Sequence, residues 1–291
     1  MRMLIAALKS LRPQQWTKNF FVFAGLIFSL NFFDSALLLK VIWAFIIFCL
    51  LSSAVYIIND LRDIEGDRQH PRKKLRPIAS GQLGLPVALV LAVILFVAAI
   101  YWAYNLNFSF FLIALAYVGL MLAYTFLLKE IVLLDVFSIA AGFVLRAIAG
   151  VVVIAVELSP WLIICTILLA LFIALGKRRH ELLTLDAAAS HRQILDEYNP
   201  QLLDQLISAV AGSTILAYAL YTLWPETLSK FETKNLVYSV PFVLYGVCRY
   251  LYLIYKQDKG GRPEKVLLSD LSLMINILLW IGSLFIIIYW F

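Results

Sequence analysis

The sequence predicts an all-α membrane protein whose helices cross the bilayer about nine times in one bundle with cytoplasmic Asp-rich loops. Of its 291 residues, 63% are hydrophobic and only 14% are charged, and the mean hydropathy is +0.90. A soluble chain of this length would carry roughly a quarter charged residues. The apolar runs do not alternate with polar residues, so helices rather than barrel strands must satisfy their backbone groups in lipid.

Nine apolar segments are long enough, as helices, to cross a hydrocarbon layer of roughly 30 Å. They lie at residues 18–33, 36–58, 85–104, 107–127, 132–155, 160–176, 202–224, 236–254 and 267–290. The sequence between them shows no repeat, low-complexity tract or separate polar domain. Residues 1–291 are therefore predicted to form one domain.

The net charge of +6 indicates membrane topology rather than a nucleic-acid partner, because the basic residues flank the apolar spans. With nine crossings, the long polar loops share one side and carry nearly all of these bases. The opposite side has only Lys40, Lys230 and Lys234. Basic loops stay in the cytoplasm, which predicts a multi-pass protein of the cell inner (plasma) membrane with a cytoplasmic N-terminus.

The first long polar segment, which follows the second span, reads NDLRDIEGDRQHPRKKLRPIASG from Asn59. If the helix continues, Asn59, Asp60, Asp63 and Asp67 lie on one face about 100° wide. Carboxylates at this spacing repel one another unless a cation lies between them. Mg²⁺ prefers one or two carboxylates together with waters and substrate phosphates. These four residues are therefore candidate Mg²⁺ ligands, with the three aspartates as catalytic candidates and a diphosphate as the other half of the site.

Basic residues follow the aspartates at once and are the natural partners of phosphate oxygens. The candidates for substrate binding are Arg68, Lys73 and Arg76. A solvated cytoplasmic loop would explain the bases alone, but not three aspartates in helical register beside them.

A second polar group, GKRRHE, ends the sixth span. On a continuing helix Lys177, Arg178 and Glu181 share one face, which offers further substrate-binding bases and a further catalytic carboxylate for an anionic substrate. The alternative is a charge cluster at the membrane edge, where a Lys–Glu pair contributes only a few tenths of a kcal/mol.

Arg146 interrupts the fifth span, and an arginine inside the membrane is expensive enough to indicate function. Asp135 lies on the same helix face, and the alternative is a structural ion pair between helices. Four further substrate-binding candidates stand at cytoplasmic span ends, where the alternative role is that of a topology anchor: Lys18, Asn19, Tyr124 and Lys129.

The pattern Asn59-Asp60-x-x-Asp63-x-x-x-Asp67 resembles the first Asp-rich motif of the UbiA superfamily of intramembrane prenyltransferases. The resemblance covers most of the chain. Within the superfamily the sequence is most similar to the branch of decaprenyl-type polyprenyl-phosphate phosphoribosyltransferases. The stretches that carry this likeness are LRPQQWTKNFFVFAGLIF, AYTFLLKEIVLLDVFSIAAGFVLRAIAG and GKRRHE.

The resemblance implies a Mg²⁺-dependent transfer of 5-phosphoribose from phosphoribosyl diphosphate to a polyprenyl phosphate, with release of diphosphate. Ordinary members carry a second DxxxD motif after the sixth span, where this chain has KRRHE. Basic residues there suit a donor with an extra phosphate. The implied donor contacts are Lys73, Arg76, Lys177 and Arg178, and those to the lipid phosphate are Lys18, Lys129 and Arg146.

Two other functions are open. A prenyltransferase that joins a prenyl diphosphate to an aromatic or other acceptor would share the first motif but favour paired aspartates in the second loop. A transporter would place its charges near the membrane midplane, whereas most charges here lie at the predicted cytoplasmic rim.

Overall fold

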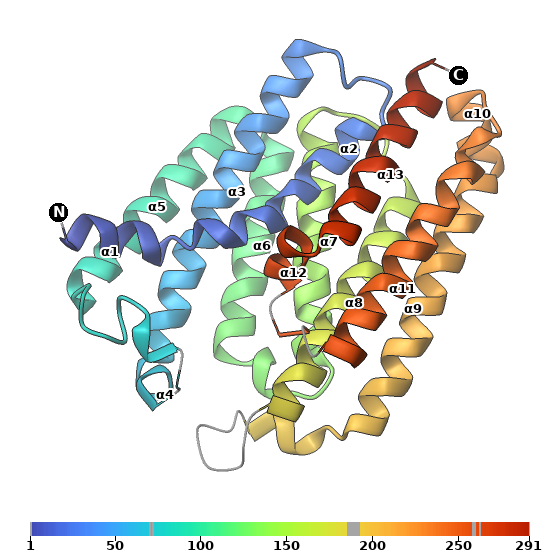
Figure 1. Cartoon of the computed structure of the whole chain (residues 1–291). Helices are drawn as coiled ribbons and strands as arrows, with labels where there is room; N and C mark the ends of the chain where they lie inside the picture. Colours follow the sequence, from blue (N-terminus) through green and yellow to red (C-terminus); the bar gives the residue numbers. More distant parts are fainter. Residues whose placement is uncertain are drawn as a thin grey trace. The chain divides into compact units, whose positions relative to one another are not determined.

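The computed structural model describes residues 2–69, 71, 73–184, 193–257, 260–261 and 263–290, and these contain helices and turns without a strand. The all-α prediction is confirmed. The chain divides into two compact units, Met1–Leu158 and Ser159–Thr184 with Leu195–Phe291 (Figure 1). The single domain over residues 1–291 stays a prediction.

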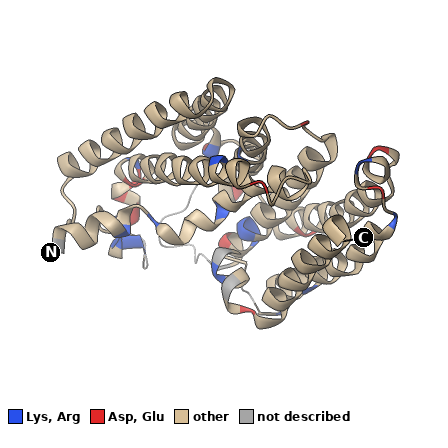
Figure 2. Ribbon diagram, turned by 90° about the horizontal axis from the view of Figure 1, so that it is seen from above, with Lys and Arg blue, Asp and Glu red and all other residues tan. Residues whose placement is uncertain are grey.

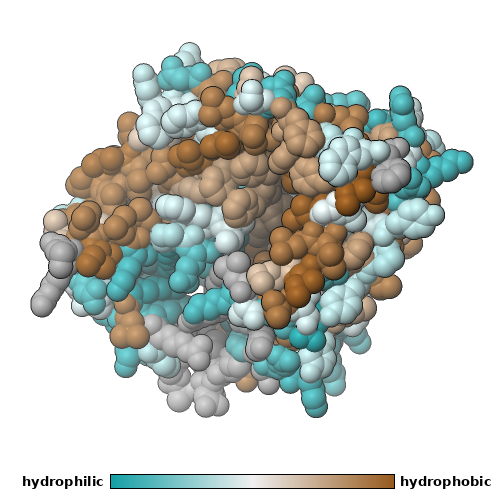
Figure 3. Space-filling view, turned by 45° about the horizontal axis from the view of Figure 1, so that its top comes forward, coloured by the Kyte–Doolittle hydropathy of each residue, from teal (hydrophilic) through white to brown (hydrophobic). Residues whose placement is uncertain are grey.

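In the described part of the chain, eight helices are long and apolar enough to cross a membrane, so this is a multi-pass membrane protein. They are Ser35–Arg62, Leu85–Leu106, Phe108–Phe126, Leu134–Val153, Pro160–Leu183, Pro200–Leu223, Asn235–Gln257 and Leu271–Trp290. The long ribbons are free of charged residues over most of their length (Figure 2). Broad apolar areas face outward in Figure 3, as a helix surface solvated by lipid requires.

The first unit is built on helix α3 (Ser35–Arg62), which begins after Asp34. The Asp34 carboxylate accepts hydrogen bonds from the amides of Ala36 and Leu37, and so caps the helix. Around α3 pack α5 (Leu85–Leu106), α6 (Phe108–Phe126) and α7 (Leu134–Val153). Their shared core contains the buried rings of Phe48, Phe110 and Tyr117.

The predicted span 18–33 takes a different form from the other eight. After α1 (Arg2–Ser10), the chain forms a 3-10 helix, η1 (Pro13–Phe23), and a single turn, α2 (Ala24–Ile27). This segment packs against α3 and α7 (Figure 1). A Cβ atom on Gly150 would lie 1.8 Å from the Val22 carbonyl oxygen. The backbones of η1 and α7 therefore touch, and a glycine on α7 makes room for this contact.

The second unit contains four spanning segments joined by short helices. Its α-helices are α8 (Pro160–Thr184), α9 (Pro200–Leu223), α10 (Pro225–Phe231), α11 (Val240–Gln257), α12 (Pro263–Ser269) and α13 (Leu271–Trp290). Helix α9 packs on α8 and α11, and α11 packs on α13. The Arg249 guanidinium joins α11 to the start of α13 through two hydrogen bonds to Asp270, of 3.1 and 2.9 Å.

The contact between η1 and α7 predicts that Gly150→Ala destabilises the protein. Overpacking costs about 1–3 kcal/mol, or a fall of about 3–10 °C in melting temperature. Gly119→Ala on α6 is the matched control, because its added Cβ would meet nothing within 4 Å. Circular dichroism of both variants in detergent measures the difference. Equal melting temperatures would contradict the contact.

Candidate active site

The four residues of the Asp-rich motif lie at the end of α3 and on α4 (Ile64–Gln69). The helix does not continue unbroken, because Asp63 ends α3 with φ −91° and ψ 13°. The helical hydrogen-bond register persists across this break. The Asp63 amide donates to the Asn59 carbonyl over 3.0 Å, and the Asp67 amide donates to the Asp63 carbonyl over 2.8 Å. The motif therefore stays on one side of the chain, as its spacing predicts.

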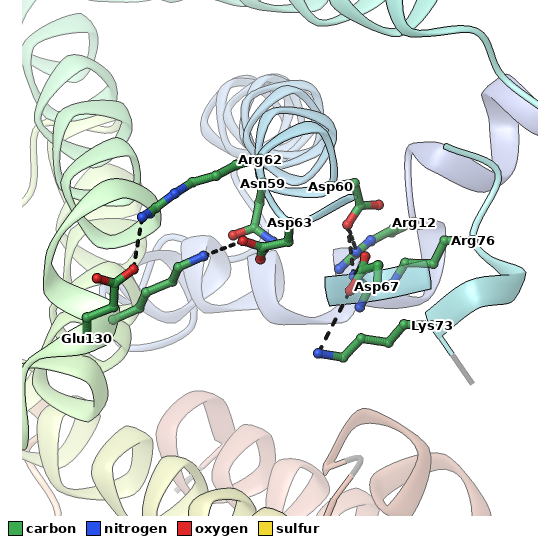
Figure 4. Close-up of polar contacts among 10 residues, drawn as sticks. Arg12, Asn59, Asp60, Arg62, Asp63, Asp67, Lys73, Arg76 and Glu130 are labelled. Atoms are coloured by element: carbon green, nitrogen blue, oxygen red, sulfur yellow. Dashed lines mark hydrogen bonds and ion pairs between the residues drawn. The ribbon is translucent and has the colours of Figure 1, made fainter. Parts of the chain in front are cut away.

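Asp60 and Asp67 are nearly inaccessible, with 3% and 2% of their surfaces exposed, and they converge on one cation. Arg76 Nη1 lies 3.0 Å from Asp60 Oδ1 and 2.5 Å from Asp67 Oδ2 (Figure 4). The Arg12 guanidinium also donates to Asp60. Lys73 Nζ lies 4.0 Å from Asp67 Oδ1. Burial makes these carboxylates costly unless positive charge is close.

Asp63 points to a different partner. Lys129, on the short 3-10 helix η3 (Leu128–Glu130), places its Nζ 2.6 Å from Asp63 Oδ1. The Asn59 amide donates to Asp63 Oδ2 over 3.1 Å. Arg62, which precedes Asp63, forms a second ion pair with Glu130, which follows Lys129; the Nη2–Oε1 distance is 2.9 Å (Figure 4). Two neighbouring ion pairs thus hold η3 against the end of α3.

Arg12 is the member of this cluster that sequence reasoning missed. It precedes η1 with a φ of 53°, and it lies 48 positions before Asp60. Its guanidinium also covers the Tyr56 ring at 5.0 Å. Burial lowers the pKa of Arg12, and the neighbouring Asp60 opposes that shift. The available signal was an arginine before proline in the LRPQQW stretch.

Several predicted binding residues lie elsewhere in the first unit. The Arg68 Nε donates to the Ala79 carbonyl over 3.2 Å, so this side chain anchors the following loop. Lys18 and Tyr124 are half-buried. Arg146 is buried on α7 and donates to Asn19 Oδ1 over 2.7 Å.

A direct ion pair between Arg146 and Asp135 is not possible within α7. Eleven residues of α-helix separate the two Cα atoms by about 16 Å. The contacts that Arg146 makes to other helices are hydrogen bonds to Asn19 and Tyr117, so among the described residues it does not form the interhelical ion pair that the sequence left open.

The KRRHE group lies at the end of α8, in the second unit. Arg178 Nη1 is 2.5 Å from Glu181 Oε2, and Lys177 Nζ is 3.7 Å from Glu181 Oε1. The three predicted side chains thus share one face. Their exposures differ: 4% of the Arg178 side chain is accessible, against 44% for Lys177. Arg179 points to Asp204 on α9, with its Nε 2.5 Å from the carboxylate.

The donor set of the Asp-rich motif fits a hard cation. Carboxylate and amide oxygens are the ligands that Mg²⁺ prefers, typically one or two of them with phosphate and water. Within the described ranges no three acidic, histidine or cysteine side chains are close enough to hold a metal by themselves. Asp60 and Asp67 already meet around a single positive nitrogen. The residues therefore fit a cation whose remaining ligands come from a diphosphate.

Comparison with known proteins identifies both a family and close relatives. The model of the UbiA prenyltransferase family matches residues 19–271. Decaprenyl-phosphate phosphoribosyltransferase of Corynebacterium glutamicum is 35% identical and is aligned over 97% of this chain and 86% of its own length. The proteins of that name from Mycolicibacterium smegmatis and Mycobacterium tuberculosis are 34% and 33% identical, over 95% and 97% of this chain and 90% and 93% of theirs.

Solved structures share the fold at low sequence identity. A UbiA homolog from Archaeoglobus fulgidus bound to GPP and Mg²⁺ has a TM-score of 0.75 at 19% identity, covering 97% of this chain and 99% of that one. A structure described for the biosynthesis of digeranylgeranylglyceryl phosphate synthase has a TM-score of 0.66 at 20% identity, with 98% of each chain covered.

The unequal burial at the end of α8 predicts different effects on stability. Loss of a hydrogen bond to a charged group costs about 1.5–3 kcal/mol, so Arg178→Ala should lower the melting temperature by several degrees. Lys177→Ala removes an exposed pair that contributes about 0.3–0.5 kcal/mol, and it should change the melting temperature by little. Thermal unfolding in detergent measures both variants. A larger loss in Lys177→Ala would contradict this assignment.

Proposed function

Because the chain belongs to the UbiA prenyltransferase family, we propose that it transfers 5-phosphoribose from phosphoribosyl diphosphate to a polyprenyl phosphate of decaprenyl type and releases diphosphate. The observation that carries this proposal is the near full-length similarity to proteins named decaprenyl-phosphate phosphoribosyltransferase. The basic KRRHE group supports it, because a donor with an additional phosphate needs additional cations.

Magnesium is the proposed metal, and Asn59, Asp60, Asp63 and Asp67 are the residues that would hold it. When bound, it supplies positive charge that stabilises the departing diphosphate. Asn59 and Asp63 are already hydrogen-bonded, and the backbone register of the motif is kept across the α3–α4 junction. Metal binding would therefore require side-chain rotation, with Asp60 and Asp67 turning toward this pair.

The cations around the aspartates are the proposed phosphate contacts. Arg12, Lys73 and Arg76 are held by Asp60 and Asp67, and Lys129 is held by Asp63. When phosphate oxygens arrive, these cations exchange a carboxylate partner for a phosphate partner at little cost in orientation. Pre-positioned charges that stabilise a departing anionic group provide a large share of the rate enhancement in many enzymes.

The acceptor phosphate is itself an anion, so the reaction requires no strong general base. Lys129 and Lys18 are the proposed contacts of the lipid phosphate, with Tyr124 in the same unit. In the second unit, the exposed Lys177 is the proposed contact of a substrate phosphate, and Glu181 is a proposed active-site carboxylate. Arg178 orients Glu181 through their ion pair.

The second candidate is a prenyltransferase that uses a prenyl diphosphate. It is favoured by the GPP-bound archaeal structure that shares the fold. The absence of paired aspartates in the KRRHE stretch of the sequence disfavours it.

One assay distinguishes the two candidates. The purified protein is incubated with Mg²⁺, decaprenyl phosphate and labelled phosphoribosyl diphosphate, and the lipid fraction is measured for label. A parallel reaction replaces the donor with a labelled prenyl diphosphate and an aromatic acceptor. Labelled lipid in the first reaction alone supports phosphoribosyl transfer. Product in the second alone would replace the proposal with the prenyltransferase.

Asp60→Ala and Asp63→Ala are predicted to abolish turnover without unfolding the protein. Each removes an oxygen ligand of the proposed metal and also releases a cation from its position. Glu65→Ala is the matched control, because Glu65 lies in the same segment but is exposed. Turnover and melting temperature are measured for all three variants. Wild-type turnover in either aspartate variant would remove the proposed site.

We propose that the N-terminus is cytoplasmic and, with nine crossings, that the C-terminus is not. The basis is the bias of lysine and arginine toward one set of loops. The short η1–α2 segment decides the count, because eight crossings would return the C-terminus to the cytoplasm. Reporter fusions after Phe291 and within residues 255–266 test this. The nine-crossing prediction requires a cytoplasmic signal within residues 255–266 and a non-cytoplasmic signal after Phe291. A cytoplasmic signal after Phe291 would contradict it.

A further inference from the structure

Arg146 is a buried cation, and each of its three guanidinium nitrogens donates a hydrogen bond to a neutral protein acceptor. Its Nε donates to Asn19 Oδ1 over 2.7 Å, its Nη1 to the Gly142 carbonyl over 2.8 Å and its Nη2 to the Tyr117 hydroxyl over 2.7 Å. The guanidinium also covers the rings of Tyr117 and Phe143, at 4.6 and 5.4 Å. One side chain on α7 thus contacts both α6 and η1.

The residue of η1 that Arg146 binds is itself tied to α3. Asn19 is fully buried, and its Nδ2 donates to Ser52 Oγ over 3.2 Å and to Cys49 Sγ over 3.3 Å. One turn earlier, Trp16 Nε1 donates to Ser53 Oγ over 3.1 Å. η1 is therefore held between α3 and α7 by polar contacts within an apolar bundle.

The contacts that hold η1 between α3 and α7 also affect the candidate active site. Arg12 directly precedes η1, and seven residues of 3-10 helix separate it from Asn19 by about 14 Å. Ser53 Oγ lies 2.9 Å from the Leu11 carbonyl oxygen, so the start of η1 is fixed to α3 as well. Where η1 lies therefore determines where the Arg12 guanidinium meets Asp60.

We propose that Arg146 is a positioning residue that locks η1 and thereby holds Arg12 against Asp60. Its three nitrogens already donate to protein acceptors, so this role replaces the lipid-phosphate contact that the sequence suggested. Lysine cannot take over the role, because one ammonium nitrogen lacks the planar fork that reaches three acceptors on different elements. The kinetic part of the test rests on the proposed function, whereas the structural part does not.

The kinetic test is a double-mutant cycle with Arg146→Lys and Arg12→Ala. We expect Arg146→Lys to lower kcat/KM for the diphosphate donor about tenfold, the loss that follows when one charged contact is displaced. In the Arg12→Ala background the same substitution should cost less than about twofold, because the residue that it positions is gone. An equal loss in both backgrounds would overturn the proposal. So would a rise confined to the KM of the lipid acceptor, which would make Arg146 a lipid-phosphate contact.

The structural test is amide hydrogen exchange, which needs no substrate. Arg146→Lys should speed exchange severalfold within Pro13–Phe23 while leaving α5 protected. Arg249→Lys is the matched control, an arginine substitution in the second unit that removes a bidentate pair and should leave Pro13–Phe23 unchanged. Asn19→Ser removes the hydrogen bond between Arg146 and Asn19 but leaves those from Arg146 to Tyr117 and Gly142. This second variant replaces Arg146→Lys in the exchange experiment if Arg146→Lys does not fold.

Unchanged protection of Pro13–Phe23 in Arg146→Lys and Asn19→Ser would overturn the proposal whatever the activity. The two ideas therefore fail separately. If the protein labels only the acceptor of the prenyl diphosphate reaction, phosphoribosyl transfer is refuted, but the expected exchange pattern can still be observed. A chain that labels polyprenyl phosphate without the exchange pattern would refute the positioning role alone.

Discussion

The candidate site depends on the burial of two carboxylates at the end of a membrane-spanning helix. Asp60 and Asp67 have almost no contact with solvent, and a buried carboxylate is stable only when positive charge and hydrogen bonds surround it. The chain supplies that charge from two directions: Arg76 from the loop after α4, and Arg12 from the start of η1. The electrostatic requirement of the aspartates thus determines where several distant segments must lie.

The same requirement makes the site suited to a substrate that carries both a cation and phosphates. A hard cation between the aspartates would replace the charge that the arginines provide. The arginines would then be available to phosphate oxygens in an orientation that is already set. Lys129 and Asp63 form a second pair of a cation with a carboxylate. The neighbouring Arg62–Glu130 pair holds η3, which carries Lys129, against the end of α3. In the proposed function, the residues that would contact phosphate are held in place by the residues that would bind the metal.

Sequence periodicity predicted the parts of this structure that depend on local rules. Eight of the nine expected spans coincide with long apolar helices, because hydropathy over some 20 residues reports the solvent around a helix. Asp60 and Asp67 lie together because the helical register survives even the break at Asp63, whereas Asp63 itself pairs with Lys129. Arg12 could not be found this way, since its contact with Asp60 spans 48 residues. Nor could the close approach of η1 to α7, which brings the Val22 backbone against Gly150.

Arg146 shows why an expensive residue can persist inside a membrane without touching a substrate. A lone arginine in hydrocarbon is strongly unfavourable, but here carbonyl, amide and hydroxyl oxygens accept its protons and two aromatic faces cover it. Such an arrangement is strict about geometry, because each acceptor belongs to a different element and a small shift would leave a buried charge unsatisfied. Apolar packing alone would allow η1 to slide along α3 and α7. A buried guanidinium removes that freedom, and the site at the other end of η1 needs Arg12 in one position.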